Sequence, residues 1–488
     1  MKVFICFLGF ACCYMPLSGQ KQTVQLNLEQ CIDIATNHSL QAFKAKNNYL
    51  SSYWDFLNYK ASRLPSISLQ LNPLQYNSQF TKRYDYNENI DVYRQQQLIN
   101  SSAGISVSQA VELTGGTFTI ASDLNYMRNF GESKNTQYSS VPVRLGYSQS
   151  LFGFNRFKWE KKIEPLKYEK AKKQFLYSRE ETAGTAIQNF FNLAIAQAGY
   201  KMAFENVESA DTLYTAGKEK NQLGNISQAD LLTLELDLLN ANNALENAIT
   251  RLEQATSTFL SFFNLEKNSE INLDLPDLLP EIIITSEEAF SQMKENNPDI
   301  LSYRQQKLES EQTMEQMQKN GGFDAYVSAS VGFNQAGNRM VDAYFHPLRQ
   351  DMINVSITVP IVDWGTRKRR IDAAKNNAIV TKRTVEQNEQ NLEQEVIATV
   401  AEFNRQQNLT KKSLEAYNIA TTTYNINKQR FIIGKTDVNT LTLSLNRKDS
   451  AMQNYLSALS RYWSLFYNIR KLTLFDFEKR KPLYDITY

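Results

Sequence analysis

Four short stretches of the chain alternate apolar residues with small polar residues at a period of two. In the clearest stretch, 353–361, an apolar residue occupies every odd position and a small polar residue or proline every even one. Stretches 105–113, 141–148 and 327–334 show the same alternation. A strand of about 9–11 residues with this pattern can cross a membrane in a barrel, with its apolar face toward lipid. A water-soluble antiparallel sheet with one wet face gives the same pattern, so alternation alone leaves both structures open.

Long segments without helix-breaking residues follow these stretches. Residues 366–433 contain neither Gly nor Pro, which predicts a helix of about 100 Å at 1.5 Å per residue. Segments 227–263 and 437–472 lack both residue types as well, and we expect them to form returning helices. The matching long helix of the first half contains Pro165, where we expect a kink or a late helix start.

The same order of elements occurs twice along the chain. The segment around Gly224 aligns with the segment around Gly434, 210 residues later, and nearer the start of each half the offset becomes 259. About 49 extra residues therefore belong to the first half, between residues 72 and 140. We predict a tandem duplication. Its parts are a signal peptide (1–20), a first repeat (21–265), a linker (266–284), a second repeat (285–475) and a C-terminal tail (476–488).

The N-terminus has the pattern of an export signal. Residues 1–20 contain a lysine, an apolar run and a small polar end, and the apolar run is too short for a membrane-spanning helix, which needs about 20 residues. Lipidation at Cys12 or Cys13 is the alternative use of this segment. We expect Cys31, the cysteine outside this segment, to be a small buried apolar residue on a short helix.

Composition excludes several classes of function. Lys and Arg number 53 against 51 Asp and Glu, so no strongly basic field indicates nucleic-acid binding. The chain has only two histidines and four cysteines, which does not favour histidine acid–base catalysis or a Cys/His metal site. The sequence contains neither a nucleophile elbow nor a phosphate-binding loop. We therefore predict a protein that is not an enzyme and that binds no cofactor and no metal.

Aromatic residues and the number of strands favour the membrane structure over the soluble sheet. Aromatic side chains follow the strand stretches, as an interfacial girdle would; the candidates are Phe152, Phe154, Trp159 and Trp364. Four strands, or six if a hairpin around Gly115-Gly116 is counted, cannot close a barrel, because the smallest transmembrane barrels have about eight. Identical copies must then share one barrel, since open edges in lipid leave backbone groups unpaired. The polar segments 76–100 and 334–349 are expected to be loops outside it.

Taken together, the export signal, the repeat, the strand end Pro-Ile-Val-Asp-Trp-Gly at 360–365 and the segment Gln-Arg-Phe-Ile-Ile-Gly at 429–434 resemble the TolC-type outer-membrane efflux proteins. The resemblance implies a mainly α protein with membrane β: a tandem-repeat protomer that contributes strands to a shared trimeric transmembrane β-barrel and long helices to a periplasmic α-barrel. Three copies of four strands would make a twelve-stranded barrel.

The resemblance also implies a function. The protein would be a passive exit channel in the outer membrane of a Gram-negative bacterium, with a long periplasmic portion. It would dock a periplasmic adaptor (membrane-fusion) protein and an inner-membrane RND or ABC transporter, and export small molecules such as drugs or metal ions, or secreted polypeptides. The residues alone leave open a different function, a periplasmic coiled-coil scaffold or adhesin without a pore.

In the family, the turns between the long helices form the tip at which the adaptor docks. By position, the resemblance implies docking contacts at Leu223, Gly224, Asn225, Ile433, Gly434 and Lys435. It also implies a periplasmic constriction just beyond these turns, at Asp230 and, in the second repeat, at Thr440. Asp437 has a competing interpretation from the sequence, because it precedes Thr440 by three residues as a helix N-cap would.

Overall fold

The computed structural model describes residues 23–86, 88–130, 134–224, 226–266, 269–276 and 281–483. The predicted signal peptide, with Cys12 and Cys13, lies outside the described residues, and so does Asn225. None of the helices in the described ranges has an apolar stretch long enough to cross a lipid bilayer.

The helices of the described chain form two sets of four, and corresponding members have equal lengths. The first set comprises α1 (Leu28–His38), α2 (Leu40–Ala61), α3 (Arg156–Gln222) and α4 (Gln228–Phe263). The second set comprises α5 (Ser286–Asn296), α6 (Pro298–Lys319), α7 (Thr366–Ile432) and α8 (Val438–Thr473). Both sets run 11, 22, 67 and 36 residues. This correspondence confirms the predicted tandem repeat and its long helices.

Local sequence explains where several of these helices begin. Asn27 and Gln30 form a capping box at the start of α1, and Asn297 caps α6 with proline at its first turn, both of which satisfy N–H groups that a helix start leaves free. Helix α3 starts at Arg156 and contains Pro165 in its interior. The predicted late start at this proline is therefore wrong.

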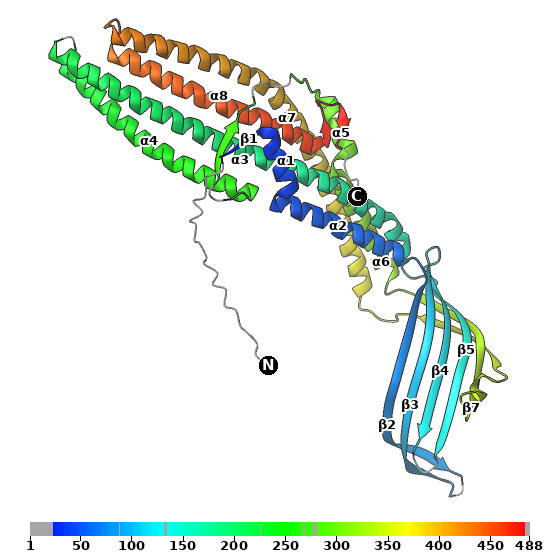
Figure 1. Cartoon of the computed structure of the whole chain (residues 1–488). Helices are drawn as coiled ribbons and strands as arrows, with labels where there is room; N and C mark the ends of the chain where they lie inside the picture. Colours follow the sequence, from blue (N-terminus) through cyan, green and yellow to red (C-terminus); the bar gives the residue numbers. More distant parts are fainter. Residues whose placement is uncertain are drawn as a thin grey trace, which may run out of the picture. The chain divides into compact units, whose positions relative to one another are not determined.

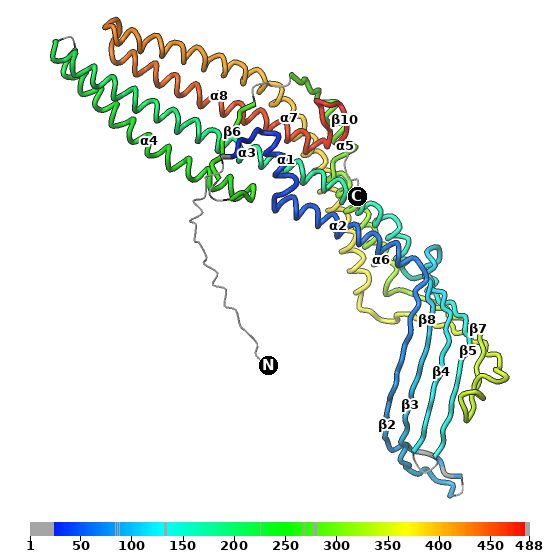
Figure 2. Tube along the Cα trace, in the orientation of Figure 1, coloured from blue at the N-terminus to red at the C-terminus, as the bar shows by residue number. Residues whose placement is uncertain are grey.

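Six strands form one antiparallel sheet (Figures 1 and 2). They are β2 (Ser66–Asp85), β3 (Ile90–Val111), β4 (Gly116–Asn129), β5 (Asn135–Ser150), β7 (Asp324–Gly337) and β8 (Leu348–Thr358). Neighbours along the sheet follow the order β2-β3-β4-β5-β7-β8. The turn between β3 and β4 ends at Gly115, whose φ of +79° favours glycine. A short 3-10 helix, Asp342–Tyr344, lies between β7 and β8.

The sheet corrects one expectation from the sequence. Segment 76–100 was expected to be a loop, but most of it forms the long arms of the β2–β3 hairpin. The pattern that predicts β2 is present, because Ile67, Leu69 and Leu71 alternate with polar residues. In the described chain the sheet has six strands, the number predicted when the hairpin around Gly115-Gly116 is counted. Segment 334–349 is mostly irregular, as expected, although β7 continues to Gly337.

The chain divides into two compact units. One contains the described residues of 1–46, 176–293 and 396–485, and the other those of 47–175 and 294–395. The first unit is helical, with two small sheets. Strand β1 (Thr23–Asn27) pairs in parallel with β6 (Glu270–Asp274), which lies inside the predicted linker, and β9 (Phe475–Asp476) pairs with β10 (Lys481–Pro482).

A large apolar core beside the β1–β6 sheet holds the first unit together. Phe190 and Phe191 of α3 and Phe259 of α4 are completely buried in it. Cys31 of α1 belongs to the same core and is also completely buried, which confirms the prediction for this residue. Burial raises the pKa of the Cys31 thiol to about 12, because a buried site disfavours the charged thiolate.

Candidate channel surfaces and helical turns

One face of the six-stranded sheet is mainly apolar. A single row of register partners is apolar on five of the strands, at Ile67, Val107, Ile120, Leu145 and Val331, and ends on β8 at Asp351. On the edge strand β8, Ile353 is 78% exposed, and Val355 and Ile357 are also exposed. An apolar face of this size in water would normally be covered by a second layer of structure. Its exposure makes it a candidate lipid-facing surface.

The opposite face of the sheet carries small polar residues. Hydrogen bonds join Ser68 to Ser106 and Asn72 to Ser102 across the first two strands, each at 2.9 Å. An ion pair joins Arg144 to Asp123 across β4 and β5, with 3.2 Å between Nη2 and Oδ2. Small hydroxyl and amide groups with a compensated charge pair are typical of a strand face that borders water inside a barrel.

Glycine makes room for this charge pair on the polar face. A Cβ atom at Gly104 would lie 2.5 Å from Oδ1 of Asp123, its register partner on β4. A Cβ atom at Gly332 would lie 2.6 Å from the backbone oxygen of Val143. At Gly332 the close atom belongs to the backbone, so glycine is required there; at Gly104 a side chain would instead displace the carboxylate of Asp123.

Aromatic side chains border the apolar face at both of its ends. At the end far from the helices, the rings of Tyr126 and Tyr138 lie 5.1 Å apart, and Tyr76 is 56% exposed. Between Ile67 and Tyr76, β2 rises about 30 Å along the strand. At a tilt of about 45° this is roughly 20 Å, close to the apolar band of about 25 Å on membrane barrels. This far row was not predicted from the sequence; Tyr76 lies in the segment 76–100 that was expected to be a loop.

The predicted girdle residues lie at the end near the helices, with different exposures. Trp364 is 86% exposed and Phe152 is 53% exposed, with its ring 5.2 Å from that of Phe323. Phe154 is half-buried. Trp159, on α3, is only 5% exposed, and its indole N–H donates to Oε2 of Glu315 at 2.9 Å. A girdle requires an exposed ring, so the assignment of Trp159 to the lipid interface is wrong; its ring packs between helices α3 and α6.

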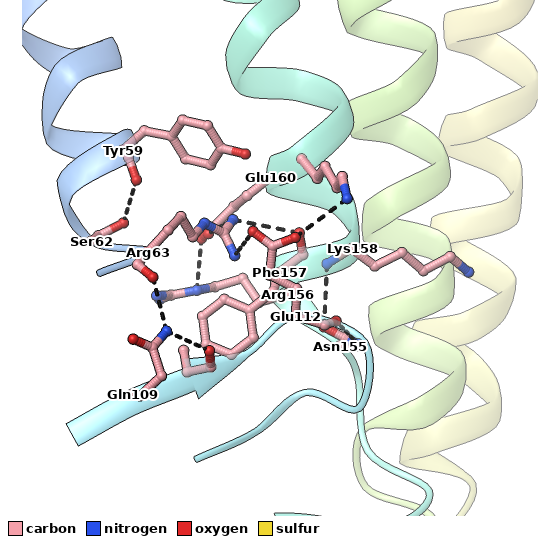
Figure 3. Close-up of polar contacts among 12 residues, drawn as sticks. Tyr59, Ser62, Arg63, Gln109, Glu112, Asn155, Arg156, Phe157, Lys158 and Glu160 are labelled. Carbon is pink, nitrogen blue, oxygen red and sulfur yellow. Dashed lines mark hydrogen bonds and ion pairs between the residues drawn. The ribbon is translucent and has the colours of Figure 1, made fainter. Parts of the chain in front are cut away.

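The sheet joins the helices through a cluster of charged and aromatic side chains (Figure 3). Its centre is Arg63, which lies two residues after the end of α2 and has a side chain that is 12% exposed. The Arg63 guanidinium donates to Oε2 of Glu160 at 2.9 Å and lies 3.6 Å from Oε1 of Glu112. It stacks over the rings of Tyr59 and Phe157, with 4.8 and 5.0 Å between the guanidinium carbon and the ring centroids.

Backbone groups complete this junction. The side-chain amide of Gln109, on β3, donates to the carbonyl of Arg63 at 2.8 Å, and Asn155 donates to the carbonyl of Glu112 at 3.0 Å. Asn155 also accepts the backbone N–H of Lys158 and so caps the start of α3. Figure 3 shows these side chains converging from α2, β3 and α3. The junction therefore fixes where the sheet begins relative to the two helix ends beside it.

The turns between the long helices lie together at one end of the helical unit (Figure 1). Gly224 and Gly434 adopt φ of +74° and +75°, the left-handed conformation that ends many helices. The ammonium of Lys220 donates to the carbonyl of Phe431 at 2.6 Å. The hydroxyl of Thr442 donates to Asp237 at 2.9 Å. A second small apolar core lies beneath the turns: Leu213, Leu234, Tyr424, Phe431, Val438 and Leu441.

Most of the predicted docking residues are accessible. Leu223 is 75% and Ile433 is 64% exposed, and Gly224, Gly434 and Lys435 are exposed as well. Asn225 lies outside the described residues.

The predicted constriction residues take part in helix caps. Asp230 belongs to the capping box of α4, where its carboxylate accepts from the N–H of Ser227 at 3.1 Å. Asp437 is the N-cap of α8, as predicted, and accepts the N–H of Thr440 at 2.8 Å. This hydrogen bond lowers the pKa of the Asp437 carboxyl. Each turn thus carries one capping carboxylate, at the third helical position in the first repeat and at the N-cap in the second.

Comparisons with known proteins agree with this architecture. A family model described as outer membrane efflux protein matches residues 60–260 and 289–462. Comparison with curated proteins gives no match. Among solved structures, the outer-membrane channel OprN matches at 13% identity with a TM-score of 0.64, covering 92% of this chain and 90% of that chain.

Two further channel structures match over similar lengths. The CmeC outer membrane channel of Campylobacter jejuni matches at 14% identity with a TM-score of 0.66, covering 94% of this chain and 87% of that chain. The MtrE outer membrane channel of Neisseria gonorrhoeae, in its open state, matches at 16% identity with a TM-score of 0.57, covering 91% and 88%. At these identities the likeness shows the fold.

Proposed function

The chain belongs to the outer membrane efflux protein family, and we propose that it is a passive exit channel that docks a periplasmic adaptor protein and an inner-membrane transporter. The observation that carries the proposal is the six-stranded sheet, with one exposed apolar face, one small polar face and two edges. In a soluble scaffold, a packed layer would cover the apolar face. Lipid on one side and water on the other satisfy both faces.

The active form is a homotrimer in the outer membrane of a Gram-negative bacterium. Six strands cannot close a transmembrane barrel, so several copies of the chain must contribute their strands to one barrel. Helices α3 and α7, with 67 residues each, span about 100 Å and form the wall of a periplasmic tunnel. The channel supplies a path and performs no chemistry, and energy and selectivity come from the inner-membrane partner. That partner is an RND or ABC transporter, and the cargo is a small molecule, such as a drug or metal ion, or a secreted polypeptide.

The adaptor docks on the two helical turns. Leu223 and Ile433 offer exposed apolar side chains, and Lys435 adds a cation beside them. Because Gly224 and Gly434 end their helices in the left-handed conformation, both turns present backbone groups that a partner helix can approach closely. Asn225 is part of the same proposed surface.

The entrance of the tunnel is narrowed near the capping carboxylates. Asp230 is half-buried and Thr440 is exposed, and three copies bring three of each to the entrance. A ring of carboxylates would favour cations over anions. Phe152, Phe154 and Trp364 lie at the lipid interface of the barrel.

Reconstitution of the purified protein into planar bilayers tests the proposal. We expect discrete conductance steps, and fractionation with outer membranes that resists carbonate extraction. A silent bilayer together with release by carbonate would contradict a channel and support the scaffold alternative. Photo-crosslinkers at Leu223 and Ile433 test docking separately, with Lys448, a side chain that is mostly buried, as a position at which no adaptor adduct is expected.

A further inference from the structure

The strands β3 and β4 have no counterpart in the second repeat. There, β7 and β8 pair directly with each other. In the first repeat, β2 corresponds to β7 as the first strand and β5 corresponds to β8 as the last strand, but β3 and β4 lie between them. The predicted insertion is thus an additional hairpin within the sheet. Because it adds two strands, β2 and β5 keep opposite directions, as β7 and β8 do.

The inserted hairpin is built as part of the wall. Fourteen register pairs join β3 to β4, from Leu98–Asn129 to Val111–Gly116, and both strands also pair with their outer neighbours. Ile105 and Ile120 continue the apolar face, and Ser106 continues the polar face. A hairpin folded against the outside of a barrel would not share both faces and both ladders with its neighbours.

The two edge strands of the sheet have the directions needed to pair with each other between copies of the chain. Strand β2 lies at one edge and β8 at the other, and along six antiparallel strands these two run in opposite directions. A β8 strand of one copy can therefore continue the antiparallel ladder onto β2 of the next. Strand β8 has 11 residues, enough to cross the hydrocarbon layer at a barrel's tilt. Lipid does not tolerate either edge unpaired.

We propose that three copies of this chain close a barrel of eighteen strands, in which β8 of each copy pairs with β2 of the next. The inference rests on the proposed trimeric channel and departs from the twelve strands that the family resemblance implies. Barrel diameter grows roughly linearly with strand number, so this barrel is about half again as wide as a twelve-stranded one. Barrels of 16–18 strands leave a water-filled channel, which the small polar lining face supports.

Strand pairing between copies can be read by disulfide formation. Ser68→Cys on β2 is combined in turn with Met352→Cys, Asn354→Cys or Ser356→Cys on the same polar face of β8, in the full-length protein with Cys31→Ala. On oxidation, we expect at least one pair to give covalent dimers and trimers on a denaturing gel. As a matched control, Thr119→Cys on the interior strand β4, combined with Asn354→Cys, should stay monomeric.

Electron cryomicroscopy of the unmodified protein in detergent counts the strands directly and does not depend on the variants. Three-fold particles with eighteen strands are expected. A two-fold particle with twelve strands, or a three-fold particle with twelve strands and the β3–β4 hairpin outside the wall, would overturn the inference. If such particles still conduct in planar bilayers, the channel function stands and only the strand number fails. Monomers that do not conduct would overturn both.

Discussion

Adjacent residues on β3 provide a sharp test of which face of the sheet meets lipid. Ile105 lies on the apolar face, paired with Leu69 of β2, and is 49% exposed. Ser106 follows it on the polar face, where its hydroxyl bonds that of Ser68. Ile105 is midway along the strand between Ile99, which pairs with Tyr76 at the far aromatic row, and the end of β3 at Val111. We therefore place it near the centre of the membrane.

The expected cost of a charge differs strongly between these two positions. An arginine on the lipid face near the bilayer centre costs about 2–4 kcal/mol, or about 6–12 kcal/mol for three copies. On the polar face, Ser106→Arg exposes its charge to water and loses one hydroxyl–hydroxyl bond, which contributes about 1 kcal/mol. Ile105→Arg should therefore hinder assembly, while Ser106→Arg should leave it nearly intact.

The assay compares outer-membrane fractions of the two variants with the unchanged protein. Heat-modifiable migration on a gel reports the folded, assembled fraction, and urea unfolding in lipid vesicles gives the free-energy difference. Similar loss in both variants would mean that position on the strand, and not the face, decides the effect. Assembly of Ile105→Arg together with loss of Ser106→Arg would reverse the assignment of the two faces.

Three further predictions concern buried groups. Arg63→Lys should destabilise the junction and lower the thermal midpoint, because an ammonium cannot stack between two rings as a guanidinium does. Arg156 pairs with the same carboxylate, that of Glu160, but its side chain is 70% exposed. Arg156→Lys should therefore change the thermal midpoint little. Arg470→Met should lower stability by about 3–5 kcal/mol, measured by chemical unfolding, because it leaves Glu180 buried without the two hydrogen bonds it receives at 2.9 and 3.1 Å; a change below about 1 kcal/mol would contradict a buried ion pair. Because the pKa of Cys31 is raised to about 12, its thiol stays protonated at pH 8, and maleimide should label it only after denaturation; rapid labelling of the native protein would refute its burial.

The sequence predicts the helices better than the strands, for a physical reason. A helix depends on neighbouring residues, so the absence of Gly and Pro from 366 to 433 is nearly sufficient to predict α7, which ends at Ile432. At Pro165 only the predicted late helix start is wrong, because a proline inside a helix removes one backbone hydrogen bond and α3 continues on both sides of it. The start at Arg156 is set instead by Asn155, which accepts the N–H of Lys158 in the helix and donates to the carbonyl of Glu112, just after β3.

Strand pairing depends on contacts that are distant in the chain, and this is where prediction failed. The glutamines and asparagines between Tyr76 and Asn100 favoured a loop in the prediction, yet most of them have a register partner in the β2–β3 ladder: Asn77, Gln79, Gln95, Gln96, Gln97 and Asn100. Trp159 illustrates the same limit. From the sequence, an aromatic residue after a strand fits an interfacial girdle as well as it fits a helix contact. Its hydrogen bond to Glu315, 156 residues away, decides between the two. The paired turns at Gly224 and Gly434 were recognisable because a helix-ending glycine is a local signal.

The two repeats have equal helices but unequal numbers of strands, which indicates that different constraints act on the two parts. Shortening one long helix by a single turn would move its end by about 5.4 Å and separate Lys220 from the Phe431 carbonyl that it binds at 2.6 Å. The turns could then no longer share their apolar core. A hairpin inserted into the sheet, by contrast, leaves the direction and both faces of every other strand unchanged. A shared barrel can therefore widen by pairs of strands while the helical turns keep their positions.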